Sequence, residues 1–155
     1  MLEITVARTY PVSPAVLWEE LRHLERHVDW MHDAVAISFT SDAREGVGTE
    51  FTCLTKVGPL RTRDRMTITA WEEPRVIGVA HRGLVTGEGR FTLQPAAAGT
   101  TLTWRENLTL PWFFGGPCGA VVARPILRFI WRRNLALLAR RFAAHDASNP
   151  ANGEP

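Results

Sequence analysis

The densest set of metal-ligating side chains in this chain lies in HLERHVDWMHD, residues 23–33. His23 and His27 are four residues apart, a spacing that places two imidazoles on one face of a helix, where they can share a metal ion. A zinc-protease helix carries a glutamate directly after its first histidine, but here that position is Leu24. The segment therefore favours structural or solvated histidines, and we expect neither a metal site nor any other cofactor.

Two carboxylates interrupt apolar rows in segments that alternate like strands: Asp64 within residues 60–71 and Glu106 within residues 100–110. Residues of one parity share one face of a strand, so both carboxylates should point toward the interior. Desolvating such a charge is costly unless the group is paired, hydrogen-bonded or protonated. With their apolar neighbours, such groups have the composition of a ligand site. The predicted ligand-binding residues are Met66, Ile68, Arg82, Trp104, Glu106, Leu108, Ile130, Asn134 and Leu138.

Acid–base chemistry is the only catalysis that these residues suggest. The sequence contains no nucleophile elbow, no phosphate-binding glycine loop and no set of metal ligands. Glu106, Asp64 and His81 are the candidates for a general acid or base. We expect Arg82 or Arg90, from neighbouring strands, to pair with Glu106 and keep it ionised. The alternative is a structural ion pair or a bulge, since a one-residue shift of register would turn these side chains outward.

An aromatic segment, PWFFGGPCG at residues 111–119, precedes the last helix. Trp112, Phe113 and Phe114 are too many consecutive aromatics for an ordinary solvated loop. They could cap a cavity, contact a membrane or a partner, or pack under the rim of the sheet. The arginine-rich helix that follows favours membrane contact, because cationic amphipathic elements bind anionic lipid surfaces.

That helix, predicted over about 118–145, is the only long helix candidate in a chain that otherwise alternates like strands. At about 100° per residue, its apolar residues cover half of the circumference, while Arg128 and Arg132 fall on the opposite side. So broad an apolar face must be covered, and a curved antiparallel sheet is the only partner available. One helix laid across such a sheet tends to leave a hollow between them, which indicates a binding cavity.

The other elements follow from alternation, proline and glycine. Ser13 followed by Pro14 is typical of a helix start, and Glu73-Pro74 interrupts the alternating pattern. We expect a strand over 2–10, short helices over 15–24 and 25–31, strands over 34–39, 49–57, 60–71, 75–82, 87–94 and 100–110, and then the long helix.

Length and composition limit the class of protein. The 155 residues suit one domain over 1–147, with a disordered polar tail at 148–155. Cys53 and Cys118 lie far apart, and no apolar run approaches the roughly 18 residues of a membrane span. We therefore expect a reduced, cytoplasmic protein. Residues 1–110 carry 12 basic and 14 acidic groups, and the whole chain has a net charge of only +2, too small a positive surplus for nucleic-acid binding.

Several short motifs follow one another along almost the whole chain. They are VSP at 12–14, VLW at 16–18, Trp30, Gly46-Val47-Gly48, WEEPR at 71–75 and GTTLT at 99–103. No single motif is specific, but their order and spacing resemble the SRPBCC superfamily, which includes START-like lipid-transfer domains, pollen-allergen-like proteins and polyketide cyclases.

The resemblance implies an α+β helix-grip fold. In that fold a seven-stranded antiparallel sheet wraps around a long C-terminal helix, with two short helices after the first strand. It also implies binding or transport of a small hydrophobic ligand, lipid or polyketide-like, in a cavity between sheet and helix. A polyketide cyclase or aromatase is the alternative, and an interaction module such as a toxin or assembly factor is the second alternative. The scarcity of catalytic motifs favours a carrier over an enzyme.

Overall fold

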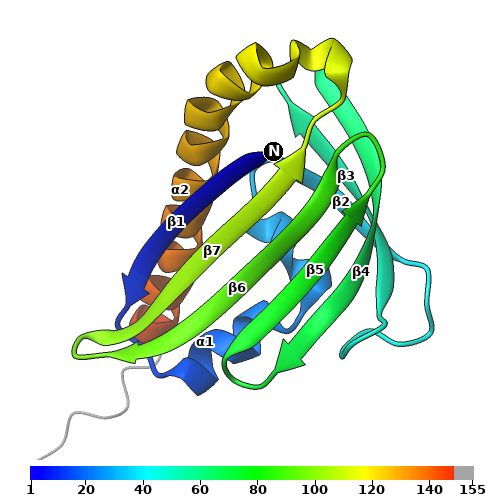
Figure 1. Ribbon diagram of the computed structural model, residues 1–155. Helices are drawn as coiled ribbons and strands as arrows, with labels where there is room; N and C mark the ends of the chain where they lie inside the picture. The colour runs from blue at the N-terminus through cyan, green and yellow to red at the C-terminus, as the bar shows by residue number, and fades with distance from the viewer. Residues whose placement is uncertain (149–155) are drawn as a thin grey trace, which may run out of the picture.

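One antiparallel sheet and one long helix dominate the structure (Figure 1). The computed structural model describes residues 1–148, so the tail predicted at 148–155 lies outside the described residues, apart from the last residue of the helix. The elements are β1 (Leu2–Tyr10), α1 (Pro14–Leu21), the 3₁₀ helix η1 (Leu24–Asp29), β2 (Ala34–Phe39), β3 (Glu50–Val57), β4 (Leu60–Glu72), β5 (Val76–Arg82), β6 (Thr86–Ala96), β7 (Gly99–Thr109), the 3₁₀ helix η2 (Trp112–Phe114) and α2 (Gly116–Ser148).

The seven strands are ordered β1-β7-β6-β5-β4-β3-β2, so the first strand lies beside the last and β2 forms the opposite edge. All neighbours are antiparallel, and bulges interrupt the register between Ala34 and Ala36 and between Ile68 and Ala70. The sheet curves, and α2 runs along its inner side next to β1 (Figure 1). The predicted helix-grip fold is confirmed.

Alternation decides which side chains of the strands are buried. In β1 every second residue from Leu2 to Val6 is buried, and in β7 every second residue from Thr100 to Leu108 is buried. Period-two alternation places residues of one parity on the concave face, toward α2. The same rule places the intervening residues on the convex face, in solvent.

The short helices close one end of the sheet. Ser13 caps α1: its Oγ accepts a hydrogen bond from the Val16 amide at 3.4 Å, and Pro14 follows at the first helical position. Leu17 and Trp18 of α1 are almost fully buried. The second predicted helix is the 3₁₀ helix η1, which starts one residue earlier than expected and is shorter.

Three polar contacts fix the second half of α2. The Tyr10 hydroxyl donates to the Leu135 carbonyl at 2.7 Å, and Arg141 pairs with Glu20. Asn134, fully buried, accepts from the His32 amide. The first half of α2 is far more exposed, because its opening turns lie across the end of the sheet instead of along the inner face (Figure 1).

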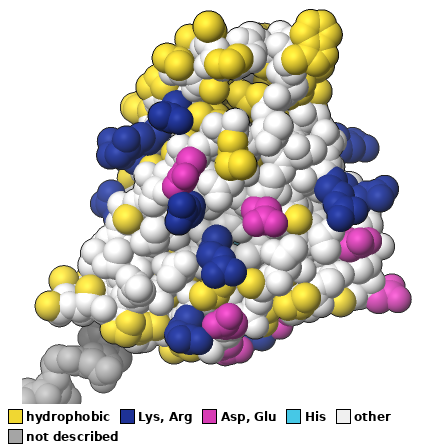
Figure 2. All heavy atoms as spheres, in the orientation of Figure 1, with side chains coloured by type: hydrophobic (Ala, Val, Ile, Leu, Met, Phe, Trp, Pro, Cys, Tyr) yellow, Lys and Arg dark blue, Asp and Glu magenta, His cyan; other side chains and the backbone are white. Residues whose placement is uncertain are grey.

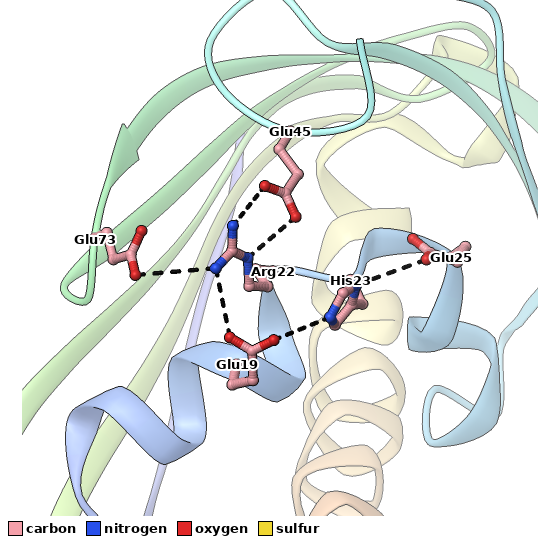
Figure 3. A network of polar contacts seen from close by, with 6 residues as sticks. All are labelled: Glu19, Arg22, His23, Glu25, Glu45 and Glu73. Atoms are coloured by element: carbon pink, nitrogen blue, oxygen red, sulfur yellow. Dashed lines mark hydrogen bonds and ion pairs between the residues drawn. The ribbon is translucent and has the colours of Figure 1, made fainter. Parts of the chain in front are cut away.

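A surface ion-pair network joins α1 to two loops (Figure 3). The Arg22 guanidinium donates two hydrogen bonds to Glu45 in the β2–β3 loop, at 2.6 and 3.1 Å. It also lies 3.4 Å from Glu19 and 4.0 Å from Glu73 in the β4–β5 turn. One cation therefore holds three separate segments together.

Candidate ligand-binding site

A cavity of about 320 Å³ lies between the concave face of the sheet and α2. Its wall is built mainly of aliphatic and aromatic side chains from β2 through β7, from η1 and from the first half of α2. At its inner end Trp104 stacks on Trp131 with ring centroids 5.1 Å apart, and Phe91 meets Trp104 edge-on at 5.2 Å. The two stacked indoles leave no room for a ligand between them, so together they contribute one aromatic surface to the wall.

A polar patch interrupts this apolar wall. Glu106, on β7, is 4% exposed, and its Oε1 accepts a hydrogen bond from Trp104 Nε1 at 2.8 Å. Its Oε2 lies 3.2 Å from Nε2 of His81, on β5. The distance is that of an ion pair, but neither of these two buried atoms makes a hydrogen bond of standard geometry with the described side chains, residues 1–143, or with the described backbone. Both therefore keep hydrogen-bonding capacity toward the cavity.

Asp64, on β4, is the second buried carboxylate of the wall. Its Oδ2 accepts from the Thr62 hydroxyl at 3.0 Å, and its Oδ1 accepts from the Leu84 amide at 2.9 Å. Asp64 therefore has partners of its own, whereas the pair of Glu106 and His81 is less completely satisfied.

Electrostatics favour the charged form of His81. Burial by itself lowers the pKa of this imidazole, but contact with the Glu106 carboxylate and the negative charges of Glu106 and Asp64 outweigh burial. The pKa of His81 is therefore raised above its usual value. The site can present a proton donor and a carboxylate acceptor side by side in a largely apolar cavity.

Two glycines make room for the two carboxylates. A Cβ atom on Gly89, in β6, would overlap the carboxylate of Glu106, and a Cβ atom on Gly83 would overlap Oδ1 of Asp64. Neither glycine has a left-handed backbone. The space they leave, not their conformational freedom, is what these positions supply.

The expectation that an arginine pairs with Glu106 is wrong. Arg82 is exposed and stands beside Arg65 across the β4–β5 register, and it does not line the cavity. Arg90 is also exposed and stands opposite Arg105. The cause is strand parity: His81 shares its parity with the cavity-lining residues of β5, so the next residue points outward.

That parity is contained in the sequence. Ile77, Val79 and His81 form an alternating row in β5, as Asp64 does with its apolar neighbours in β4. Alternation of inward and outward side chains along the strand predicted at 75–82 therefore places His81 on the cavity side and Arg82 on the solvent side.

The remaining predicted residues divide into two groups. Met66, Ile68, Trp104, Glu106 and Leu108 line the cavity, as do the acid–base candidates Asp64 and His81; Ile130, Asn134 and Leu138 do not. Asn134 accepts from the His32 amide at 2.9 Å and donates to Asp33 Oδ1 at 2.6 Å, so its polar groups are already used.

The aromatic segment before α2 also divides. Phe114 lines the cavity and is half-buried, whereas Trp112 is 85% exposed and Phe113 59% exposed. One aromatic of the three therefore closes the cavity, and the other two face outward.

The two histidines of the 23–33 segment have different environments. His23 lies at the surface, 3.2 Å from Glu19 (Figure 3). His27 is buried, its Nε2 lies 2.8 Å from the Leu21 carbonyl, and burial lowers its pKa to about 4. Among the described side chains, residues 1–143, no group of three or more His, Cys, Asp or Glu could hold a metal ion.

The sequence profile of a protein family described as polyketide cyclase / dehydrase and lipid transport matches residues 1–145. The chain belongs to this family. The match confirms the SRPBCC resemblance seen in the motifs. No curated protein sequence matches the chain. None of the helices within residues 1–148 combines the length and hydrophobicity that a bilayer crossing needs.

Solved structures share the fold of this family member at low sequence identity. TTHA0849 from Thermus thermophilus has a TM-score of 0.78 and 18% identity, over 92% of this chain and 98% of its own. The di-domain ARO/CYC StfQ from the steffimycin biosynthetic pathway has a TM-score of 0.72 and 15% identity, over 95% of this chain and 52% of its own. Ginseng major latex-like protein 151 from Panax ginseng has a TM-score of 0.69 and 8% identity, over 90% of this chain and 95% of its own.

Proposed function

We propose that this member of the polyketide cyclase / dehydrase and lipid-transport family binds a small, mostly apolar ligand that carries at least one polar oxygen. The observation that carries the proposal is the buried pair of His81 and Glu106 in the wall of an otherwise apolar cavity. At about 320 Å³, the cavity is at the lower end of the roughly 300–1,000 Å³ of typical small-molecule sites.

The polar patch would orient the ligand. An imidazolium at His81 donates a hydrogen bond to a carbonyl or hydroxyl oxygen, and Glu106 accepts one from a hydroxyl. The aromatic part of the wall, formed by Phe91, Trp104 and Trp131, favours a ring next to that polar oxygen. A ring bearing a hydroxyl or carbonyl group, or a polyketide-like chain, satisfies both requirements.

Native mass spectrometry of the purified protein, followed by extraction of apolar molecules, tests this proposal directly. A second measurement uses the neutral fluorophore N-phenyl-1-naphthylamine, whose emission rises in an apolar site. Val79→Trp fills the cavity and should abolish the rise, because Val79 lines the wall. The matched control is Val35→Trp on β2, where the valine is 51% exposed. Equal binding of the probe by both variants would contradict the proposal.

Acid–base catalysis on such a ligand is the second candidate, favoured by the adjacency of His81 and Glu106. On a β-diketone, Glu106 would accept the proton from the carbon between two carbonyls while His81 donates its proton to a carbonyl oxygen. The C–H bond and one N–H bond of His81 break, O–H bonds form on Glu106 and on the carbonyl oxygen, and the product is the enol. Glu106 then returns its proton to His81, whose Nε2 lies 3.2 Å away, which restores both side chains. Deuterium exchange at that carbon, followed by NMR with acetylacetone, should be accelerated by the parent protein and not by Glu106→Gln. Equal rates would leave the protein a carrier.

A further inference from the structure

Large apolar side chains gather at the end of the molecule where α2 begins (Figure 2). We call this surface the apolar tip; its members are Trp112, Phe113, Val121, Val122, Ile126 and Phe129. Their exposed fractions run from 49% at Ile126 to 85% at Trp112. Leaving so many large apolar groups together in water is costly, and such a patch marks an interaction surface.

The charge around the tip has a single sign. Between Glu106 and Asp146 the chain carries six arginines and no aspartate, glutamate or lysine. Arg124 and Arg128, in the same turns of α2 as the tip residues, are exposed and form no ion pair with any side chain of residues 1–143. The tip therefore combines apolar side chains with unpaired positive charge.

The cavity reaches the surface at this same end. Its wall there includes Ile126 of the tip, Phe114 next to the tip in sequence, and Leu60 at the β3–β4 turn. Ile126 is 49% exposed and Leu60 is 38% exposed. Side chains that line a cavity and are also exposed mark its opening, so the apolar tip forms one side of the cavity mouth.

We infer that the apolar tip docks this protein on an anionic phospholipid membrane, with the cavity mouth facing the lipid. This inference goes beyond ligand binding in the cavity and does not depend on it. Amphipathic helices with arginines beside Trp and Phe lie in the interface of anionic bilayers, where the apolar side chains enter the acyl region and the arginines contact phosphates. Aromatic residues such as Trp112 are enriched at that depth.

Two other occupants fit the tip less well. A second copy of the chain would bring the same unpaired arginines, Arg124 and Arg128, close to their own equivalents, and like charges repel. An acidic protein would satisfy the charge, but Trp112 and Phe113 project from a 3₁₀ turn, 85% and 59% exposed. Projecting aromatics enter a fluid lipid phase readily, whereas a rigid protein partner must offer a matching pocket for each.

Vesicle cosedimentation tests the inference, using vesicles of phosphatidylcholine alone and of phosphatidylcholine mixed with phosphatidylglycerol. The parent protein should bind the anionic vesicles and only weakly the neutral ones. Trp112→Ala/Phe113→Ala should weaken the binding roughly tenfold or more, and Arg124→Gln/Arg128→Gln should do the same at low salt. Added salt should remove the effect of the arginine changes but not that of the aromatic changes.

The matched charge control is Arg8→Gln/Arg26→Gln, which removes two exposed arginines elsewhere: Arg8 pairs in register with Leu102, at the opposite end of β7 from Trp112. This control should bind like the parent protein. Brominated phosphatidylcholine should quench the parent's tryptophan fluorescence, and Trp112→Phe should lose most of the quenching while still binding. Failure of the parent to bind either kind of vesicle, or a dimer in light scattering that dissociates on Trp112→Ala/Phe113→Ala without vesicle binding, would overturn the inference.

Discussion

His81 and Glu106 contact each other across an intervening strand. Nε2 of His81, on β5, lies 3.2 Å from Oε2 of Glu106, on β7, and β6 runs between them. Gly89 of β6 stands directly opposite Glu106 in the register. Because Gly89 has no side chain, the imidazole and the carboxylate can meet above it, and the polar patch depends on all three positions.

Removing the Glu106 charge should change how stability depends on pH. The pKa of His81 in the folded protein is raised above 6.5, the ordinary pKa of histidine. As pH rises past 6.5, the folded state therefore holds on to a proton that the unfolded state releases. The pair's contribution is therefore complete below pH 6.5 and is lost as pH rises through the folded pKa. Glu106→Gln should flatten this fall in the free energy of unfolding, measured by urea titration at several pH values.

Glu106→Ala and Glu106→Gln should lower the free energy of unfolding by different amounts. The alanine variant leaves His81 and Trp104 Nε1 without their partner. Its free energy of unfolding should fall by about 3 kcal/mol, the order expected for a broken buried pair. The glutamine amide oxygen still accepts from Trp104 Nε1, so that variant should lose less. If both variants melt like the parent, Glu106 contributes nothing and the pair does not form in solution.

Gly89→Ala should displace the Glu106 carboxylate. A Cβ atom at position 89 would occupy the space of that carboxylate, so Glu106 must turn away from His81. We expect the pH dependence of stability to match that of Glu106→Gln, with weaker binding of any ligand recovered from the cavity. Gly46→Ala tests a turn glycine far from the site and should leave the pH dependence of the parent unchanged.

His27 should make the protein sensitive to acid. Its pKa is lowered to about 4 by burial, so between pH 6.5 and 4 the unfolded state binds a proton that the folded state does not. This contribution to the free energy of unfolding should be complete above pH 6.5 and should fall by about 3 kcal/mol as pH decreases across the window. His27→Gln should lack this component, while His32→Gln, at an exposed position, should keep it.

Asn134 should matter for stability and not for ligand affinity. Asn134→Leu removes the acceptor of the His32 amide and the donor to Asp33, and should lower the free energy of unfolding by about 2 kcal/mol. The variant should still bind the naphthylamine probe, because Asn134 does not line the cavity. Arg140→Gln, at an exposed position of the same helix, serves as the neutral control; loss of probe binding by Asn134→Leu alone would place Asn134 in the binding site.

Arg22 should control the mobility of the β2–β3 loop (Figure 3). Arg22→Gln removes both hydrogen bonds to Glu45 and the contacts with Glu19 and Glu73. Amide hydrogen exchange in residues 41–48 should accelerate in this variant, and added salt should reduce the difference because the ion pairs are exposed. Arg26→Gln, in the neighbouring η1, should exchange like the parent.

Much of the fold follows from local periodicity. Each residue's side of a strand depends only on parity, so the alternating pattern by itself assigns the rows containing Asp64 and Glu106 to the inner face. The long helix and the helix start at Ser13 are equally local features. The family resemblance rests on the order of motifs, and that too is contained in the sequence.

Contacts between distant segments were decided by the tertiary structure. The partner of Glu106 depends on the register of β5, β6 and β7, which bulges and hairpin turns determine and which parity alone does not reveal. Asn134 lies on an apolar face, but its partners come from residues about a hundred positions earlier. The outward direction of Trp112 was also undetermined, because the opening turns of α2 lie across the end of the sheet and only the second half packs against its inner face.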